Sequence, residues 1–399
     1  MSGGSFLKHL LFSGFFLCVC ILQTQTVWAQ EAEEETIIEP EIIEEESSST
    51  KSNLLDDMNL AKVQETITEL LGEDTFDLQE AVEKLLNGEE VLTKEYAKSL
   101  IQGILFSSLN LQKETIVQIL LLIILAALFA NFSNVFQNSQ IGEMSYYMVY
   151  LLLLAILIRS FGDLSSQIHT VLTYLVTFMK ALMPAYFLAI TVSSGTGTAM
   201  MYYEMVLALT YIIQVVLLTV ILPGVNIYVL LELVNYLHKE DFLSKMAELL
   251  KMIIEWALKT CLAFIVGLQV VQSMVTPVLD SLKRTIVGKT ASAIPGVGNA
   301  IDAVAEVVLG TSIVVRNCLG VAAIIVLVLI GIAPLIKLAV MTILYKFLAA
   351  LTQPVSDKRI VGCLNTVGEG CALLLKMLVT IEVLCMITIA ILAISFFGT

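Results

Sequence analysis

The sequence predicts an all-α, polytopic membrane protein with about seven or eight transmembrane helices and a small N-terminal helical domain outside the cytoplasm. Residues 31–114 hold 22 of the 36 acidic side chains and 6 lysines, whereas residues 115–399 hold 14 acids and 15 bases. The second part also contains repeated apolar runs of about 20 residues, the length that crosses roughly 30 Å of hydrocarbon. No basic face could neutralise phosphates, so we expect no nucleic-acid partner.

The N-terminal residues 1–29 are typical of a secretory signal, with an apolar run from Leu10 to Leu22 and an expected cleavage after Ala29. An uncleaved membrane anchor is the alternative. Residues 30–53 follow as an acidic, disordered linker, because nine of the sixteen residues from Glu31 to Glu46 are Glu.

Residues 54–113 are predicted to form a small helical ectodomain of two or three short amphipathic helices. Its apolar residues recur at helical spacing: Leu60, Val63, Ile67, Leu70 and Leu71, then Leu78, Val82, Leu85 and Leu86. Fewer than about sixty residues give a marginal core, so we expect this part to dock on its own membrane domain or on a partner.

Residues 114–399 are predicted to form the membrane domain. We expect spans near Thr115–Gln137, Met144–Phe161, Val171–Val192, Ala199–Leu222, Thr260–Leu279, Ser312–Ala333, Pro334–Leu351 and Cys371–Phe397. The seventh could instead be re-entrant or interfacial, because it begins at a proline and contains Lys337 and Lys346.

An amphipathic helix near residues 241–259 is expected between the fourth and fifth spans. One face carries Phe242, Leu243, Met246, Leu249, Leu250, Ile253 and Ile254, and the other carries Lys245, Glu248, Lys251, Glu255 and Lys259. This pattern predicts a helix that lies in the membrane interface or on a partner.

The positive-inside rule orients the expected spans. With the ectodomain outside, eight spans place five basic residues in cytoplasmic loops, where they are candidates for docking a partner: Lys283, Arg284, Lys289, Lys358 and Arg359. The lysines between His238 and Thr260 then fall outside, which conflicts with the rule, although neighbouring acids offset them.

Charged residues at membrane depth cost about 2.5–3.5 kcal/mol each on insertion scales, so they need partners, water or a route to the interface. The candidates for a polar conduit or for helix pairing are Lys180, Glu204, Arg316, Lys376 and Glu382. Structural pairing or snorkelling is the favoured interpretation for most of them. Glu382, near mid-span with Lys376 six residues earlier, is the strongest candidate for a conduit.

Motifs for catalysis, metals and cofactors were sought in the sequence. Gly288-Lys289-Thr290 lacks the first glycine of a phosphate-binding loop, because Lys283 occupies that position. The chain has 3 histidines, and the cysteines lie in apolar segments, where they are expected to be buried hydrophobic residues. We therefore expect neither an enzyme nor a resident metal or cofactor.

Two segments are distinctive: IPGVGNAIDAVAEVVLG (Ile294–Gly310) and KALMPAYFLAITVSSG (Lys180–Gly195). With the order of signal, acidic helical region and multiple spans, they resemble the stage III sporulation protein AE family of endospore-forming bacteria, from about Leu54 to the C-terminus.

Asp302 and Glu306 in the first segment could hold a cation or pair with bases, although a solvated face is the favoured alternative.

The resemblance implies a mother-cell protein of the outer forespore membrane, within a secretion-like channel or feeding tube between mother cell and forespore. It implies a requirement for late forespore gene expression under sigma factor G. The implied partners are other stage III sporulation A proteins, including a ring-forming subunit and a cytoplasmic ATPase, and indirectly the forespore protein stage II Q. Two function classes stay open: a membrane platform in this complex, and a stand-alone secondary permease for a small metabolite.

Overall fold

The computed structural model describes residues 60–71, 77–88, 102, 113, 117–125, 128, 139–194, 197–237, 243–291, 298–354 and 356–394. Among these residues all regular structure is helical and no strand occurs, as the fold class predicted. The expected signal peptide and acidic linker lie outside the described residues. Residues from Thr50 onward belong to one compact unit.

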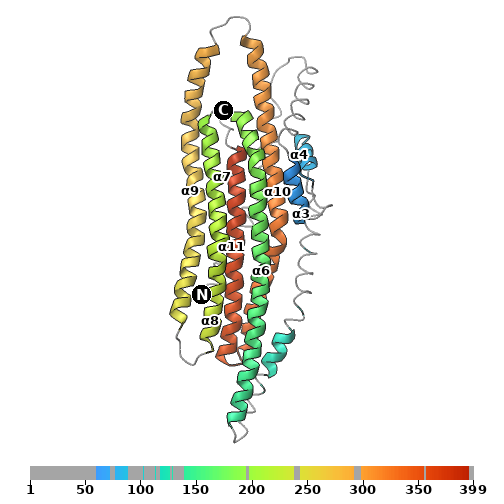
Figure 1. Ribbon diagram of the computed structural model, residues 1–399, viewed down its shortest axis with the longest axis vertical. Coiled ribbons are helices and arrows are strands. Elements are labelled where there is room, and N and C mark those ends of the chain that lie inside the picture. The colour runs from blue at the N-terminus through green and yellow to red at the C-terminus, as the bar shows by residue number, and fades with distance from the viewer. Residues whose placement is uncertain are drawn as a thin grey trace. The chain divides into compact units, whose positions relative to one another are not determined.

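Long helices make up most of the described chain (Figure 1). They are α6 (Ser139–Ser194), α7 (Gly197–Val216), the π-helical turn η1 (Leu217–Ile221), α8 (Leu222–Asn235), α9 (Ser244–Ala291), α10 (Gly298–Thr352) and α11 (Lys358–Ile394). In the described residues, four stretches are long and apolar enough to cross a bilayer: Tyr147–Ala189, Glu204–Asn235, Gly310–Thr352 and Lys358–Ala393.

The expected division into seven or eight spans is not confirmed by the described residues. The second and third expected spans are one helix, α6, and the sixth and seventh are one helix, α10. The fifth lies within α9, together with the expected interfacial helix. Of the first expected span, the structure describes helix at residues 117–125 and 128.

α6 stays helical through the polar stretch that was expected to separate two spans. Residues 162–170 contain no proline, and the hydroxyls of Thr170 and Thr173 donate hydrogen bonds to carbonyls one turn earlier, at Ser166 and His169. Such bonds fit inside a helix without ending it. At about 1.5 Å per residue, the 56 residues of α6 extend about 84 Å, far more than one hydrocarbon layer.

Prolines bend these helices without dividing them. Pro184 lies inside α6 and Pro334 inside α10, where each removes one backbone hydrogen bond. Pro223 lies in the first turn of α8, directly after η1. The wider π turn accommodates the ring of Pro223, so α7, η1 and α8 follow one another without a break.

The expected amphipathic helices of the N-terminal region are present as α3 (Ala61–Leu71) and α4 (Leu78–Leu86). Val63 and Ile67 of α3 and Leu78 and Val82 of α4 are buried, as their spacing predicted. Asp77 caps α4, since its carboxylate accepts a hydrogen bond from the Glu80 amide at 3.0 Å. Both helices contact α10, and α3 also contacts α6.

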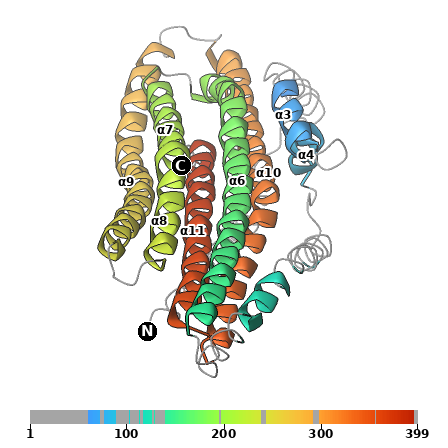
Figure 2. The same cartoon turned by 60° about the horizontal axis from the view of Figure 1, so that its bottom comes forward.

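The bundle core lies where α11 packs between α10, α6 and α8, which run side by side in both views (Figures 1 and 2). α10 and α11 are antiparallel, as are α10 and α6, where the hydroxyls of Ser160 and Tyr345 lie 2.7 Å apart. Glycines permit the closest approaches between neighbouring helices. A Cβ at Gly370 would lie 2.4 Å from Val229 and 2.8 Å from Phe161, so α8 and α6 both press on α11 there.

Candidate functional site

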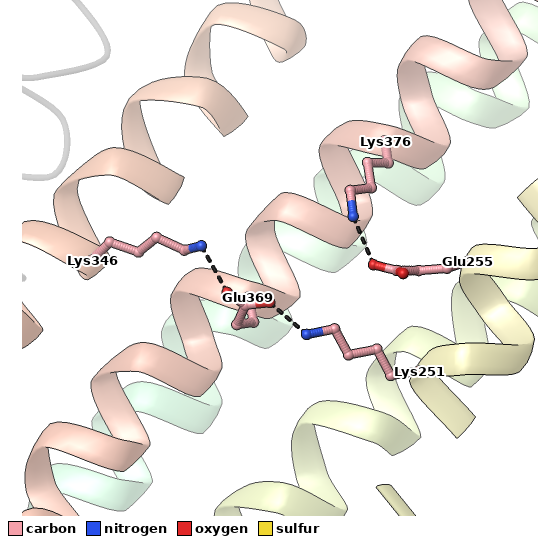
Figure 3. A network of polar contacts seen from close by, with 5 residues as sticks. All are labelled: Lys251, Glu255, Lys346, Glu369 and Lys376. Carbon is pink, nitrogen blue, oxygen red and sulfur yellow. Dashed lines mark hydrogen bonds and ion pairs between the residues drawn. The ribbon is translucent and has the colours of Figure 1, made fainter. Parts of the chain in front are cut away.

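Charged side chains from α9, α10 and α11 form a network inside the bundle (Figure 3). Glu369 of α11 accepts a hydrogen bond from Lys251 of α9 at 2.6 Å and another from Lys346 of α10 at 2.7 Å. The Glu369 carboxylate of α11 therefore connects this helix to both α9 and α10.

A second ion pair lies two turns along α11. Lys376 donates a hydrogen bond to Glu255 of α9 at 2.7 Å. Lys251 and Glu255 are one turn apart on α9, so the two helices are joined at successive levels. We call these five residues the charge ladder; their side chains are 27–44% exposed.

The charge ladder explains the orientation of α9. Its charged residues Lys251 and Glu255 face α11, while Trp256 is 67% exposed. The other exposed apolar side chains of this part of α9 are Met246, Leu249, Met252 and Ile253. The expected amphipathic helix near residues 241–259 is the first part of α9. It packs against α8 and α11, with Lys251 and Glu255 directed toward α11.

Glu382 lies deeper, between α11 and α10, and is 4% exposed. A Cβ at Gly331 would lie 1.1 Å from its Oε1, so the carboxyl group fills the space beside a glycine of α10. Among the described residues, Oε1 has no hydrogen-bond partner. We call this arrangement the carboxyl niche.

Uncharged polar groups lie beside the carboxyl niche. Gln214 of α7 donates a hydrogen bond to the Cys385 sulfur at 2.9 Å, and the hydroxyls of Thr210 and Thr388 lie 2.8 Å apart. Cys385 is one turn after Glu382 on α11. This part of the core is therefore polar but carries no charge pair.

Arg316 lies toward the other end of the α10–α11 contact and is completely buried. Its Nη2 donates a hydrogen bond to the Ala393 carbonyl at 3.3 Å. One turn later, the space beside Gly320 holds the Tyr186 hydroxyl of α6, 2.7 Å from where a Cβ would be. Of the two alternatives for Arg316, structural pairing or snorkelling, its burial fits pairing, because α6 and α11 enclose it.

The other candidates lie on the bundle surface. Lys180 and Glu204 are exposed, and the Lys180 ammonium lies 4.9 Å from the ring centre of Tyr211. A cation over a tyrosine ring is stabilised without a carboxylate partner. Lys337 donates a hydrogen bond to Gln167 of α6.

The structure pairs the candidate residues differently from the sequence prediction. Lys376 and Glu382 were considered together, but Lys376 pairs with Glu255. Glu255 and Lys251 were placed on the charged face of an interfacial or partner-binding helix, and Glu369 was missed. Its flanking glycines, Gly368 and Gly370, were an available signal, because they let neighbouring helices approach the carboxylate closely.

The basic docking candidates are only partly described. The backbone of Lys283, Arg284 and Lys289 lies in helix α9 and not in a loop, and their side chains lie outside the described residues. The side chains of Asp302 and Glu306 also lie outside them. Lys358 and Arg359 are the first residues of α11, and Lys358 is exposed.

Comparison with known proteins gives one consistent result. The family described as stage III sporulation protein AE matches residues 76–395. The stage III sporulation protein AE of Bacillus subtilis (strain 168) is 23% identical over 289 residues, which cover 72% of each chain. No solved structure matches.

Proposed function

We propose that this chain, which belongs to the stage III sporulation protein AE family, acts in sporulation as a membrane platform within a multi-subunit complex between mother cell and forespore. The observation that carries the proposal is the charge ladder. Its five charged groups form two sets of ion pairs between helices, Lys251–Glu369–Lys346 and Lys376–Glu255, so they stabilise packing and are not displayed toward a passing solute.

Close helix packing supports a platform as well. Besides Gly370, α11 has Gly362, where a Cβ would lie 2.5 Å from the Tyr236 ring. Such contacts hold α8 and α11 at a fixed separation, because neither helix can move inward. A rigid bundle suits a subunit that positions other proteins.

The proposed setting is the outer forespore membrane, with the N-terminal region outside the mother-cell cytoplasm. There the chain works with other stage III sporulation A proteins, including a ring-forming subunit and a cytoplasmic ATPase, and indirectly with the forespore protein stage II Q. In this proposal the secretion-like complex supports late forespore gene expression. The basic residues Lys283, Arg284, Lys289, Lys358 and Arg359 bind the cytoplasmic partner.

A stand-alone permease is the second candidate, and the carboxyl niche is the observation that favours it. A deeply buried carboxyl group with an unpaired oxygen is a common element of proton-coupled transport. The platform is preferred because the other buried ionisable groups are engaged in packing contacts.

Reconstitution in liposomes separates the two candidates. We expect vesicles that contain the folded chain alone to retain trapped small metabolites, with or without Glu382→Gln. Release that depends on Glu382 would overturn the platform in favour of the permease. Reversing the charges of Lys283, Arg284 and Lys289 should reduce co-purification of the cytoplasmic partner from sporulating cells, and unchanged recovery would remove the docking role.

A further inference from the structure

Unlike Glu248, Glu255 and Glu369, Glu382 forms no ion pair with a lysine or arginine of the described residues. Lys376 is turned toward Glu255 on α9. Around Glu382 the neighbouring segments carry no charged residue: 317–336 of α10, 205–231 of α7 and η1–α8, and the remainder of 377–394 on α11.

The titratable groups at this level are weak acids or lie on the surface. α11 brings Cys385, and α7 brings Tyr211, with the Lys180 ammonium of α6 4.9 Å from the centre of its ring. α6 also brings Tyr174 and His169, which is exposed. Lys180 is a permanent cation, but its side chain is exposed and lies over the Tyr211 ring.

The carboxyl niche has no room for a counter-ion on its α10 side. The carboxyl oxygen already occupies the position of a Cβ at Gly331, so the two helices are separated by the carboxyl group itself. In the ionised form Oε1 would be a buried charged oxygen without a hydrogen-bond partner among the described residues, whereas the neutral acid has a smaller cost of burial.

The neighbouring polar groups suit a neutral acid. A protonated carboxyl group carries an O–H donor in addition to its acceptor oxygens. Gln214 of α7, which bonds Cys385 one turn from Glu382, has a buried Oε1 with no partner among the described residues. Gln214 therefore brings an unpaired acceptor oxygen to the surroundings of the niche, while its amide N–H is engaged with Cys385.

We propose that Glu382 is a proton-binding site, held as a neutral acid between α10 and α11, and that it can ionise only when these helices separate at Gly331. The ligand is a proton. The site is a property of this chain alone and depends neither on partners nor on transport.

Carbodiimide labelling tests the proposal in the full chain, purified in detergent. A hydrophobic carbodiimide takes the proton of a neutral acid onto its nitrogen, and the carboxylate oxygen adds to its central carbon. In a water-poor site the adduct rearranges to a stable N-acylurea, so the protein gains one whole reagent molecule and nothing leaves. Mass spectrometry of peptides locates the label.

We expect the Glu382 peptide to be labelled at least about tenfold more than the Glu369 and Glu255 peptides of the same sample, which is the ratio for one unit of difference in protonation equilibrium. Glu382→Gln should remove this label and leave the others unchanged. Equal labelling of Glu369 and Glu382 would overturn the proposal.

Thermal unfolding measured at several pH values is a second test, for the case in which the carbodiimide does not reach the niche. A folded state that holds an extra proton loses stability as the pH rises above the ordinary range of glutamic acid, so the wild-type melting temperature should fall relative to Glu382→Gln from about pH 5 upward. Groups that the two chains share contribute equally to both curves. Parallel curves, or a relative gain for the wild type, would overturn the proposal.

Discussion

Glu369 and Glu382 lie on the same helix, α11, but in opposite environments. Glu369 is half-buried and bridges lysines from α9 and α10, whereas Glu382 is almost fully buried beside a glycine, with one oxygen unpaired. The comparison separates two uses of a carboxyl group within one bundle. Where a charge is retained, cations and partial contact with solvent accompany it. Where both are missing, the neutral acid is the form that fits.

The largest effect is expected for Glu369→Gln, because this substitution leaves two lysines without a carboxylate. Breaking a buried pair costs about 3–5 kcal/mol, and the partial exposure of these side chains reduces our expectation to about 2 kcal/mol. A thiol-reactive dye can follow thermal unfolding, because Cys318, Cys363, Cys371 and Cys385 are buried in the folded protein.

Adding Lys346→Met to Glu369→Gln provides the control for this prediction. The second substitution removes one of the two stranded charges, so part of the lost stability should return. An unchanged melting temperature in Glu369→Gln alone would mean that the charge ladder does not hold the helices together.

Glu255→Gln is expected to have about half that effect, near 1 kcal/mol, because it strands one lysine, Lys376. The loss should be localised, since Glu255 connects α9 to α11 at a single level. Hydrogen exchange should rise in residues 244–267 of α9 more than in α11. Equal increases in both helices would contradict a role confined to the attachment of α9.

Thr210→Val addresses the uncharged part of the core and should cost about 0.5 kcal/mol. Thr388 donates a hydrogen bond to the Leu384 carbonyl at 2.9 Å, so the Thr210 hydroxyl is the donor in the Thr210–Thr388 contact. Valine removes that donor and keeps the shape. The double variant Thr210→Val/Thr388→Val should cost no more than the sum of the two single variants. A loss as large as that of Glu369→Gln would erase the distinction between the two regions.

Lys245→Gln should have no measurable effect on the melting temperature. Lys245 and Glu248 pair at 2.8 Å, as closely as the charge ladder, but their side chains are 92% and 62% exposed. Water replaces the lost contact at such a site. A clear loss here would show that distance, and not burial, governs the ion pairs of α9.

Hydropathy and spacing predicted the membrane class and the short helices α3 and α4, and they singled out Glu382 as a charged residue at membrane depth. They divided α6 and α10 into two spans each, because a window of about 20 residues treats a polar stretch as a boundary. Residues 162–170 are polar but contain no proline, so α6 continues through them. Hydropathy measures transfer from water, and helix continuity depends on backbone bonds that polar residues do not break.

The periodicity of apolar residues could not predict the orientation of α9, for a different reason. An amphipathic pattern fixes which residues share a face, but the same pattern suits a helix with its charges in water or against another helix. The partner acid, Glu369, lies in a remote part of the sequence. By contrast, the pairing of Glu382 with Lys376 could have been rejected from geometry. Six residues turn a helix by about 600°, which separates the two side chains by about 120°.

The charge ladder can be completed only after α11 has been synthesised. Lys251 and its carboxylate partner are 118 residues apart, and Glu255 and Lys376 are 121 residues apart. At about 5–20 residues per second, α9 leaves the ribosome roughly 6–24 s before its partners on α11 exist. During that interval Lys251 and Glu255 lack their partners on α11. α11 therefore completes the place of α9 in the bundle.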